Sequence, residues 1–268
     1  MELKWLEAGK HIYETGCDHG VLFLQNSDGS YATGQVWDGL TSVDENPTGG
    51  ESNPQYADNT KYLDLYSAEE FGATVNCFHY PDDWAKCDGS AEIVPGVYIG
   101  MQNRVAFGMS YRTLIGNEIV GTDYGFKIHL LWGGKAQPSD KTRSTVNDNP
   151  EATEMSYEVT TTPVGVTAIN PDTGTAYKPT SYMYIDSTKV DKEKMASFLK
   201  ILWGSEDSES RLPSPDEVIT HFKGAVYSDS KWGVLRGSLT SIGGTHNALH
   251  RNRRRSLPQR HSGNALVS

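Results

Sequence analysis

Cysteine is scarce in this sequence, and its three cysteines show no pairing pattern. Cys17, Cys77 and Cys87 are an odd number without a CxxC motif, and only Cys77 and His79 approach metal-ligand spacing. Two positions apart on a strand, these two side chains would share a sheet face and could hold half of a metal site. A core cysteine beside an ordinary histidine is the favoured interpretation, with free, reduced thiols in a reducing compartment.

Long apolar runs and catalytic motifs are also missing. No run approaches the roughly 20 residues of a membrane span, and the N-terminus lacks the apolar stretch of a secretory signal, so a cytoplasmic start is expected. There is no Gly-x-Ser-x-Gly, HExxH or Gly-x-Gly-x-x-Gly motif, and Gly-Gly-Lys at 133–135 lacks Walker spacing and predicts a turn. These absences favour a structural protein without catalytic residues or a cofactor. A further hypothesis is a hydrolase that uses Asp18, His19 or Asp83. Asp18 and His19 are expected in a turn before the first strand.

Charge divides the chain. Residues 225–268 hold seven basic groups and one acid, a net of +6, so the formal charge of −10 leaves −16 on residues 1–224. An acidic body repels nucleic acid, whereas the basic segment would attract phosphates without reading sequence. Residues 225–268 are expected to be a disordered extension. Its arginine cluster at 251–255 is read either as a nucleic-acid patch or as a segment that is not an evolved part of the domain.

Alternation of apolar and polar residues predicts a mainly β fold with flanking α-helices. A chain of 268 residues can bury a sizeable core as one large or two modest domains. A hairpin is predicted in residues 21–37, with Asp28-Gly29 as its turn. Further strands are predicted at 71–80, 94–99 with an interruption at Pro95-Gly96, 105–111, 126–132, 155–160 and 182–185.

Two of these strands carry more specific expectations. In the strand at 105–111 the large apolar residues occupy odd positions, and the small residues opposite leave room for another element to pack closely. Residues 115–125 predict a glycine-punctuated link to the strand at 126–132. On the polar face of that strand, His129 is expected to be solvated.

The stretch 56–88 joins a long polar loop to two strand-like runs and a short amphipathic turn. Along the strand at 71–80, alternation puts Thr74 and Asn76 on the side away from the core. Residues 81–87 predict a helical turn anchored by Trp84. Adjacent carboxylates at Asp82 and Asp83 diverge too much for paired catalysis and are interpreted as capping groups.

Two helices are predicted near the end of the acidic body. Asp191 is an N-cap for the first, and its apolar stripe ends before Gly204. That stripe is expected to cover a sheet; it comprises Met195, Phe198, Leu199 and Leu202. The second helix begins with a capping box of Ser214 and Glu217, with Pro215 at the first helical position.

Between these elements, residues 38–60 lose all periodicity and predict a long irregular loop. Two prolines and many Asn, Asp, Ser and Gly residues leave no regular element in the pattern. A loop of this length in a compact domain calls for a function or for disorder, and a partner-binding role is favoured over a floppy surface loop. The candidate assembly residues are Asp38, Asp44, Glu45, Pro47, Pro54 and Tyr56.

Extended segments of the sequence resemble the major tail proteins, or tail tube proteins, of long-tailed phages that infect Gram-positive bacteria. The resemblance runs almost continuously from residue 1 to about 224. It is carried by LEAGKHIYETGCDHGVLFLQ, QYADNTKYLDLYSAEEFGATVNCFHYPDDWAKCDGS, PGVYIGMQNRVAFGMSYRTLIGNE, GTDYGFKIHLLWGGKAQPSDK, EVTTTPV, IDSTKV and LPSPDEVITHF. The arginine-rich segment after residue 224 departs from the family pattern.

The resemblance implies a role in assembly. Family members have a β-sandwich or barrel-like domain, six of which close a ring, and stacked rings form the tube of the virion through which DNA passes without specific binding. Expected partners are copies of the chain itself, the tape-measure protein, the tail terminator and baseplate or distal tail proteins. No cofactor, metal, active site or membrane segment is implied, and the loop at 38–60 is expected to dock on the next ring.

A carbohydrate-binding or receptor-binding β-domain is the alternative. Trp37, Trp84, Trp132 and Tyr111 are the aromatic residues that would supply a stacking surface, although core anchors are the commoner use of such side chains.

Overall fold

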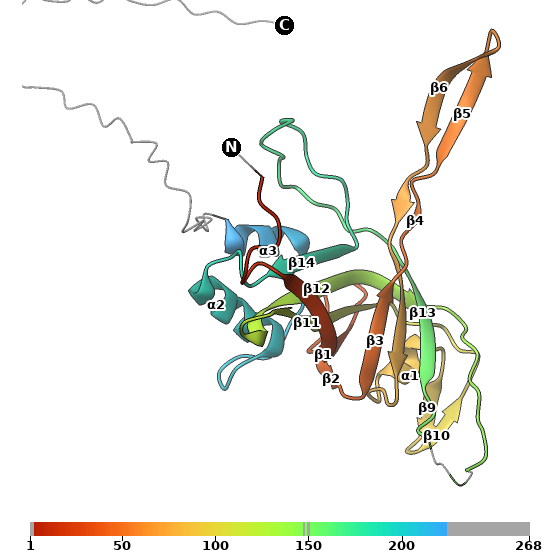
Figure 1. Cartoon of the computed structure of the whole chain (residues 1–268). Coiled ribbons are helices and arrows are strands. Elements are labelled where there is room, and N and C mark those ends of the chain that lie inside the picture. Colours follow the sequence, from red (N-terminus) through yellow and green to blue (C-terminus); the bar gives the residue numbers. More distant parts are fainter. Residues whose placement is uncertain (1–2, 147, 149–150, 224–268) are drawn as a thin grey trace, which may run out of the picture. The chain divides into compact units, whose positions relative to one another are not determined.

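The fold is mainly β, as expected from the alternation (Figure 1). The computed structural model describes residues 3–146, 148 and 151–223, which form 14 strands and three helices. The extension predicted at 225–268 lies outside the described residues. Within them no helix is long and apolar enough to cross a bilayer, since the longest, α2, has 12 residues.

One antiparallel sheet of eight strands organises the described part of the chain. Its order is β2-β1-β11-β12-β13-β8-β3, with β14 beside β12. The strands are β1 (Ile12–Leu24), β2 (Gln35–Trp37), β3 (Leu40–Glu45), β8 (Gly72–Cys77), β11 (Phe107–Asn117), β12 (Gly121–Ala136), β13 (Met155–Thr161) and β14 (Tyr182–Asp186). The sheet is open, because β2, β3 and β14 each pair on one side only among the described residues.

β11 and β12 form the longest hairpin of the sheet, and it runs through residues 115–125. The prediction of a link there is therefore wrong. Gly116 and Gly125 lie inside the strands, where a Cβ would come within 2.5 Å of Tyr13 and Thr188 respectively. Glycine at these positions makes room for a neighbouring side chain and does not interrupt the strand.

Gly133 divides β12 into two halves with different partners. Residues 127–131 pair with β14, and residues 134–136 pair with β13. Gly133 has φ +62°, and a Cβ on it would lie 2.2 Å from the carbonyl oxygen of Thr162. The Gly-Gly-Lys segment at 133–135 is thus part of a strand, and the prediction of a turn is wrong. Its glycine serves as an irregularity inside the strand, the kind of break that lets a strand change partners.

The two faces of the sheet bury separate apolar cores. Along β12, Ile128, Leu130 and Trp132 belong to one core, whereas Leu131 belongs to the other, as strand alternation requires. On β11, Gly108 lies on the face of the sheet that the helices cover. A Cβ there would lie 2.2 Å from Leu212, so the prediction that small residues allow close packing is confirmed.

The helices α2 (Lys192–Trp203) and α3 (Pro215–Phe222) cover one of these faces, as predicted. Asp191 accepts hydrogen bonds from the backbone of Glu193 and Lys194, and α2 ends at Gly204. The capping box of Ser214 and Glu217 is present at the start of α3, with Pro215 in the first turn. Buried helix residues that join this core are Met195, Phe198, Leu202 and Val218.

Several local predictions around the sheet are confirmed. β1 and β2 form the predicted hairpin, whose turn has Gly29 at φ +86°. Strand β8 alternates between buried and partly exposed residues, and Thr74 and Asn76 lie on the partly exposed side. Trp84 anchors the short helix α1 (Trp84–Cys87) in the core.

The prediction of an irregular loop at 38–60 is wrong. These residues contain β3, β4 (Thr48–Gly49), β5 (Ser52–Ala57) and the start of β6 (Thr60–Tyr66). All of them except β3 lie in a ribbon of two strands, most of whose residues are exposed. Periodicity in a sequence reports burial on one face, so a ribbon without a core gives no such signal.

The interruption predicted at Pro95-Gly96 is the turn of a second small hairpin. It joins β9 (Ala91–Val94) to β10 (Val97–Ile99), and Gly96 has φ +83° there. Asp18 and His19 lie within β1, at a register irregularity, so their predicted place in a turn before the first strand is wrong.

Candidate assembly surface

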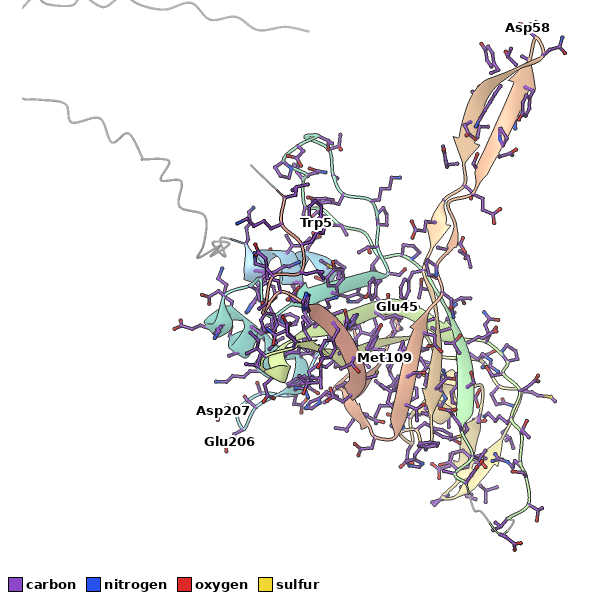
Figure 2. All side chains as sticks on the ribbon, in the orientation of Figure 1. Trp5, Glu45, Asp58, Met109, Glu206 and Asp207 are labelled. Carbon is purple, nitrogen blue, oxygen red and sulfur yellow. The ribbon has the colours of Figure 1, made fainter. Side chains whose placement is uncertain are left out.

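Residues 46–71, called the arm below, leave the sheet after β3 and return to it at β8. The arm pairs β4 with β7 (Glu69–Glu70), and then β5 with β6. Asp58 and Asn59 both have positive φ, of 50° and 58°, which suits the tight turn at its tip. Glu45 lies at the root of the arm and Asp58 at its far end (Figure 2). At about 3.3 Å per residue, the chain between them spans roughly 40 Å.

The arm exposes large apolar side chains that no other described part of the chain covers. Its exposed residues of this kind are Tyr56, Tyr62, Leu63, Leu65 and Tyr66. Tyr56 is 71% exposed and Leu65 is 54% exposed. Leu63 and Leu65 share one face of the ribbon with their cross-strand partners Gln55 and Asn53. A two-stranded ribbon without a core is marginally stable in water, and exposed apolar side chains gathered in this way are typical of a docking element.

The arm has two legs, the chain that leaves the sheet after Glu45 and the chain that returns to it through Phe71. The first leg is held to the sheet through Glu45. The hydroxyl groups of Tyr111 and Tyr182 donate to Oε1 of Glu45 at 2.7 and 2.8 Å, and His129 Nδ1 lies 3.4 Å from the same oxygen. These three partners come from β11, β14 and β12 respectively. The hydrogen bond from His129, together with those from the tyrosines, lowers the pKa of Glu45 to about 2 against the effect of burial.

The second leg is fastened next to the first. The ring of Phe71 stacks on Tyr182 with centroids 4.5 Å apart, and Thr161 donates to the Phe71 carbonyl at 2.6 Å. The amide of Asn46 donates to Gly72 across the legs at 2.8 Å. A Cβ on Gly72 would lie 2.9 Å from the Asn46 carbonyl oxygen, so glycine allows the legs to approach. Both legs therefore meet at Tyr182, which makes the root a defined junction.

The structure does not bring the six predicted assembly residues together. Asp38 lies exposed in the turn between β2 and β3, and Asp44 accepts from the side chain of Asn76 at 2.8 Å. Glu45 is held at the root, and Pro47 is exposed just beyond it. Only Pro54 and Tyr56 lie in the outer part of the arm, on β5. Of the six, Tyr56 has the largest apolar surface free to meet another molecule.

Four of the five exposed apolar residues of the arm were missed by this selection. Tyr62, Leu63, Leu65 and Tyr66 lie on β6, whose sequence TKYLDLY is rich in tyrosine and leucine but does not alternate strictly. The Asp58-Asn59 pair ahead of it is a turn signal, because both residue types tolerate positive φ. The hairpin was thus encoded locally, although its neighbouring prolines and glycines obscured it.

A second exposed apolar ribbon lies elsewhere on the same unit. The hairpin of β9 and β10 exposes Ile93, Val94, Val97, Tyr98 and Ile99, and Met101 follows it. Beside it, a hollow of about 500 Å³ is lined by Tyr98 among others. Its two strands pair only with one another among the described residues. This ribbon, like the arm, has no core of its own.

His129 is buried rather than solvated, so that prediction is wrong. It is 5% exposed, and its ring stacks on Tyr111 at a centroid distance of 4.5 Å. Its ring nitrogens lie 2.8 Å from Thr113 Oγ1 and 2.7 Å from the Tyr182 hydroxyl. The side chains of Tyr111, Tyr182 and Glu45 surround the imidazole on this face, and hydrogen bonds satisfy its nitrogens.

The residues of the hydrolase reading are engaged in other contacts. Asp18 accepts two hydrogen bonds of 2.7 Å from the guanidinium of Arg112, which lower its pKa. His19 lies against Trp203, with ring centroids 5.0 Å apart. Asp83 accepts from Gln35 and Lys86, and it makes no side-chain cap to α1, so its interpretation as a capping group is wrong.

The cysteines and the candidate stacking aromatics are mostly interior. Burial raises the pKa of Cys17 and Cys77 to about 11 and that of Cys87 to about 12, which keeps these thiols protonated. In the described part of the chain no three His, Cys, Asp or Glu side chains gather as a metal site. The aromatics considered for a glycan surface, Trp37, Trp84, Trp132 and Tyr111, are all buried.

Comparison with models of protein families gives no match for this chain, and comparison with curated proteins gives none either.

Proposed function

We propose that this chain is a structural protein of a phage tail, related to the tail tube proteins of long-tailed phages of Gram-positive bacteria. Copies assemble into six-membered rings, and the rings stack into a tube of the virion through which DNA leaves. The protein works by assembly, without catalysis and without a cofactor. The tape-measure protein, the tail terminator and baseplate or distal tail proteins are its further partners, and assembly takes place in the host cytoplasm.

The arm is the observation that carries this proposal. Its root is fixed by Glu45, Tyr182 and Phe71, whereas its outer part exposes tyrosines and leucines. A rigid root with an uncovered apolar end suits an element that orders its outer part on a neighbour. The open edges of β3 and β14 could pair with other copies in the same assembly, which would protect strands that otherwise favour aggregation.

Charge is consistent with a conduit for DNA. The net of −16 on residues 1–224 gives a wall that does not retain a polyanion passing through it.

Electron microscopy of the purified protein tests the proposal. We expect six-fold rings or hollow tubes from the intact chain. A matched variant replaces residues 52–66 by Asn-Gly, joining Glu51 to Ser67, whose backbones are already hydrogen-bonded at 3.2 Å. It should keep its fold and lose the tubes. A strict monomer that binds glycans would instead establish the carbohydrate-binding alternative, and tubes of normal length from the armless variant would remove the arm from the assembly.

A further inference from the structure

We infer that the exposed ribbon of β9 and β10 on one copy is the surface on which the arm of a second copy docks. This inference rests on the proposed function and adds its acceptor site. The ribbon is called the acceptor below; its exposed apolar residues are Ile93, Val94, Val97, Tyr98 and Ile99.

The arm and the acceptor lie at opposite ends of one strand pair. β3 and β8 are antiparallel, with Glu45 opposite Ala73 at one end and Leu40 opposite Cys77 at the other. The arm leaves from the Glu45 end. The chain that follows Cys77 leads through α1 to the acceptor. Figure 1 shows the two ribbons beyond opposite ends of this pair. A second copy displaced along the strand direction would therefore present its acceptor to the arm of the first.

The length of the arm suits this arrangement. Its legs extend roughly 40 Å from Glu45, about twice the length of β8 at ~3.3 Å per residue. The arm is therefore long enough to run along a neighbouring copy, rather than to touch only the nearest edge of that copy.

The two surfaces have matching chemistry, and both are exposed among the described residues. Leu63 and Leu65 give the arm an aliphatic face. Val94 and Val97, which pair across the two strands, give the acceptor a second one. A contact between unlike patches on identical copies is heterologous and propagates into a stack. One such contact would cover both ribbons, whereas a different partner for the arm would leave the acceptor exposed at every level of the stack.

A hollow beside the acceptor offers a place for an anchoring side chain. Its volume is about 500 Å³, and Tyr80, Ala85, Tyr98 and Met155 are among its lining residues. A tyrosine or leucine from the arm fits a hollow of this size and lining, and buried aromatic anchors dominate the affinity of many interfaces. Its charged lining residues are Lys141, Arg143, Asp82 and Asp88, and Lys141 pairs with Asp88. The arm carries five acids (Glu51, Asp58, Asp64, Glu69 and Glu70) and one base, Lys61.

The test uses two variants that are each defective in one half of the contact. The armless variant described above keeps the acceptor, and Val97→Asp keeps the arm while placing a charge on the acceptor. Ile169→Asp is the control, because Ile169 is also a well-exposed apolar residue. We expect each defective variant alone to lose at least about thirtyfold in sedimenting tubes, as loss of an interface anchor would. The control should assemble like the unmodified protein.

Mixing the two defective variants gives the decisive result. The intact arm of Val97→Asp can dock on the intact acceptor of the armless variant. Neither variant can then extend the stack, so we expect pairs of stacked units that do not grow. Normal tubes from Val97→Asp, or no pairs in the mixture, would overturn the acceptor assignment while the tubes of the unmodified protein keep the proposed function. Absence of rings and tubes from the unmodified protein would overturn both.

A second measurement guards against misfolding of Val97→Asp. Leu65→Cys on one copy and Ile99→Cys on another should form a disulfide across copies during assembly, whereas Leu65→Cys with Ile169→Cys should not. Equal cross-linking of the two pairs would overturn the inference.

Discussion

The hydroxyl of Tyr182 donates a 2.8 Å hydrogen bond to the carboxylate of Glu45, across 137 positions of sequence. Glu45 is the last residue of β3 and Tyr182 the first of β14, and these strands share no ladder among the described residues. The bond therefore joins the root of the arm to a strand that pairs with β12 and not with β3. It also fixes where the arm begins, because the other leg stacks Phe71 on the same tyrosine.

Removing this hydrogen bond should loosen the root without unfolding the protein. We expect Tyr182→Phe to lower the free energy of unfolding by about 1–2 kcal/mol, because it leaves Glu45 and the buried His129 each with one partner fewer while keeping the ring under Phe71. Glu45→Gln should cost a similar amount, and the two changes should be non-additive in a double-mutant cycle by roughly 0.5 kcal/mol or more. Urea unfolding measures all four proteins.

Tyr184→Phe is the control for this cycle, since Tyr184 is exposed on the same strand. It should change the free energy of unfolding by less than about 0.5 kcal/mol. Strict additivity of Tyr182→Phe and Glu45→Gln would show that the root contact contributes nothing as a pair.

Acid should weaken the root through the same carboxylate. Hydrogen bonds from His129 and the two tyrosines lower the pKa of Glu45 from 4.5 to about 2. A lowered pKa means that the charged form stabilises the fold, and this contribution is complete above about pH 4.5 and is lost as the pH falls toward 2. Because Glu45 is partly exposed, we expect it to be worth only about 1 kcal/mol.

The measurement is the free energy of unfolding from pH 6 to pH 2 for the unmodified protein and for Glu45→Gln. The difference between the two should shrink as the pH falls below about 4.5, because glutamine does not titrate. A difference that stays constant over this range would contradict the role assigned to the Glu45 carboxylate.

Residues with a local signal were predictable from the sequence. The caps at Asp191 and Ser214 mark helix starts because their side chains bond to the first amides of the helix, and both are present. Alternation along β8 was equally clear, since one face meets a core. Such signals depend only on neighbours in the sequence.

Residues whose role depends on distant strands were not predictable. His129 alternates onto a polar face, but β3 and β14 bring Glu45 and Tyr182 over it and bury it. Gly133 reads as a turn, yet the close approach of Thr162 explains why it is a glycine. The strands of the arm were not predicted for a different reason, because strands without a core show no apolar stripe.

The close approach at Gly133 can be separated from its backbone conformation. Gly133 and Gly121 both have φ +62°, but a Cβ on Gly121 would meet nothing within 4 Å, whereas one on Gly133 would lie 2.2 Å from Thr162 O. Gly121→Ala should therefore cost about 1 kcal/mol from the left-handed conformation alone. Gly133→Ala should cost at least about 1–3 kcal/mol more, because β12 or β13 must shift. Thermal unfolding compares them, and equal costs would mean that the strands part easily at this point.

The two faces of the arm should differ in their importance for assembly. Leu63 and Leu65 lie on one face, whereas Tyr66 pairs with Ser52 and lies on the other, the face that alternation along β5 also gives to Tyr56. Leucine forms no hydrogen bonds with water, so burial on a partner gains more from Leu63 and Leu65 than from the tyrosines, whose hydroxyls are solvated. We expect Leu63→Ser with Leu65→Ser to lower the yield of sedimenting tubes at least about tenfold.

Tyr56→Ser with Tyr66→Ser, on the other face of the arm, should lower the yield of tubes less. Neither pair should change the free energy of unfolding by more than about 0.5 kcal/mol per residue, because all four side chains are exposed in the single chain. A larger loss from the tyrosine pair would assign docking to the opposite face of the arm.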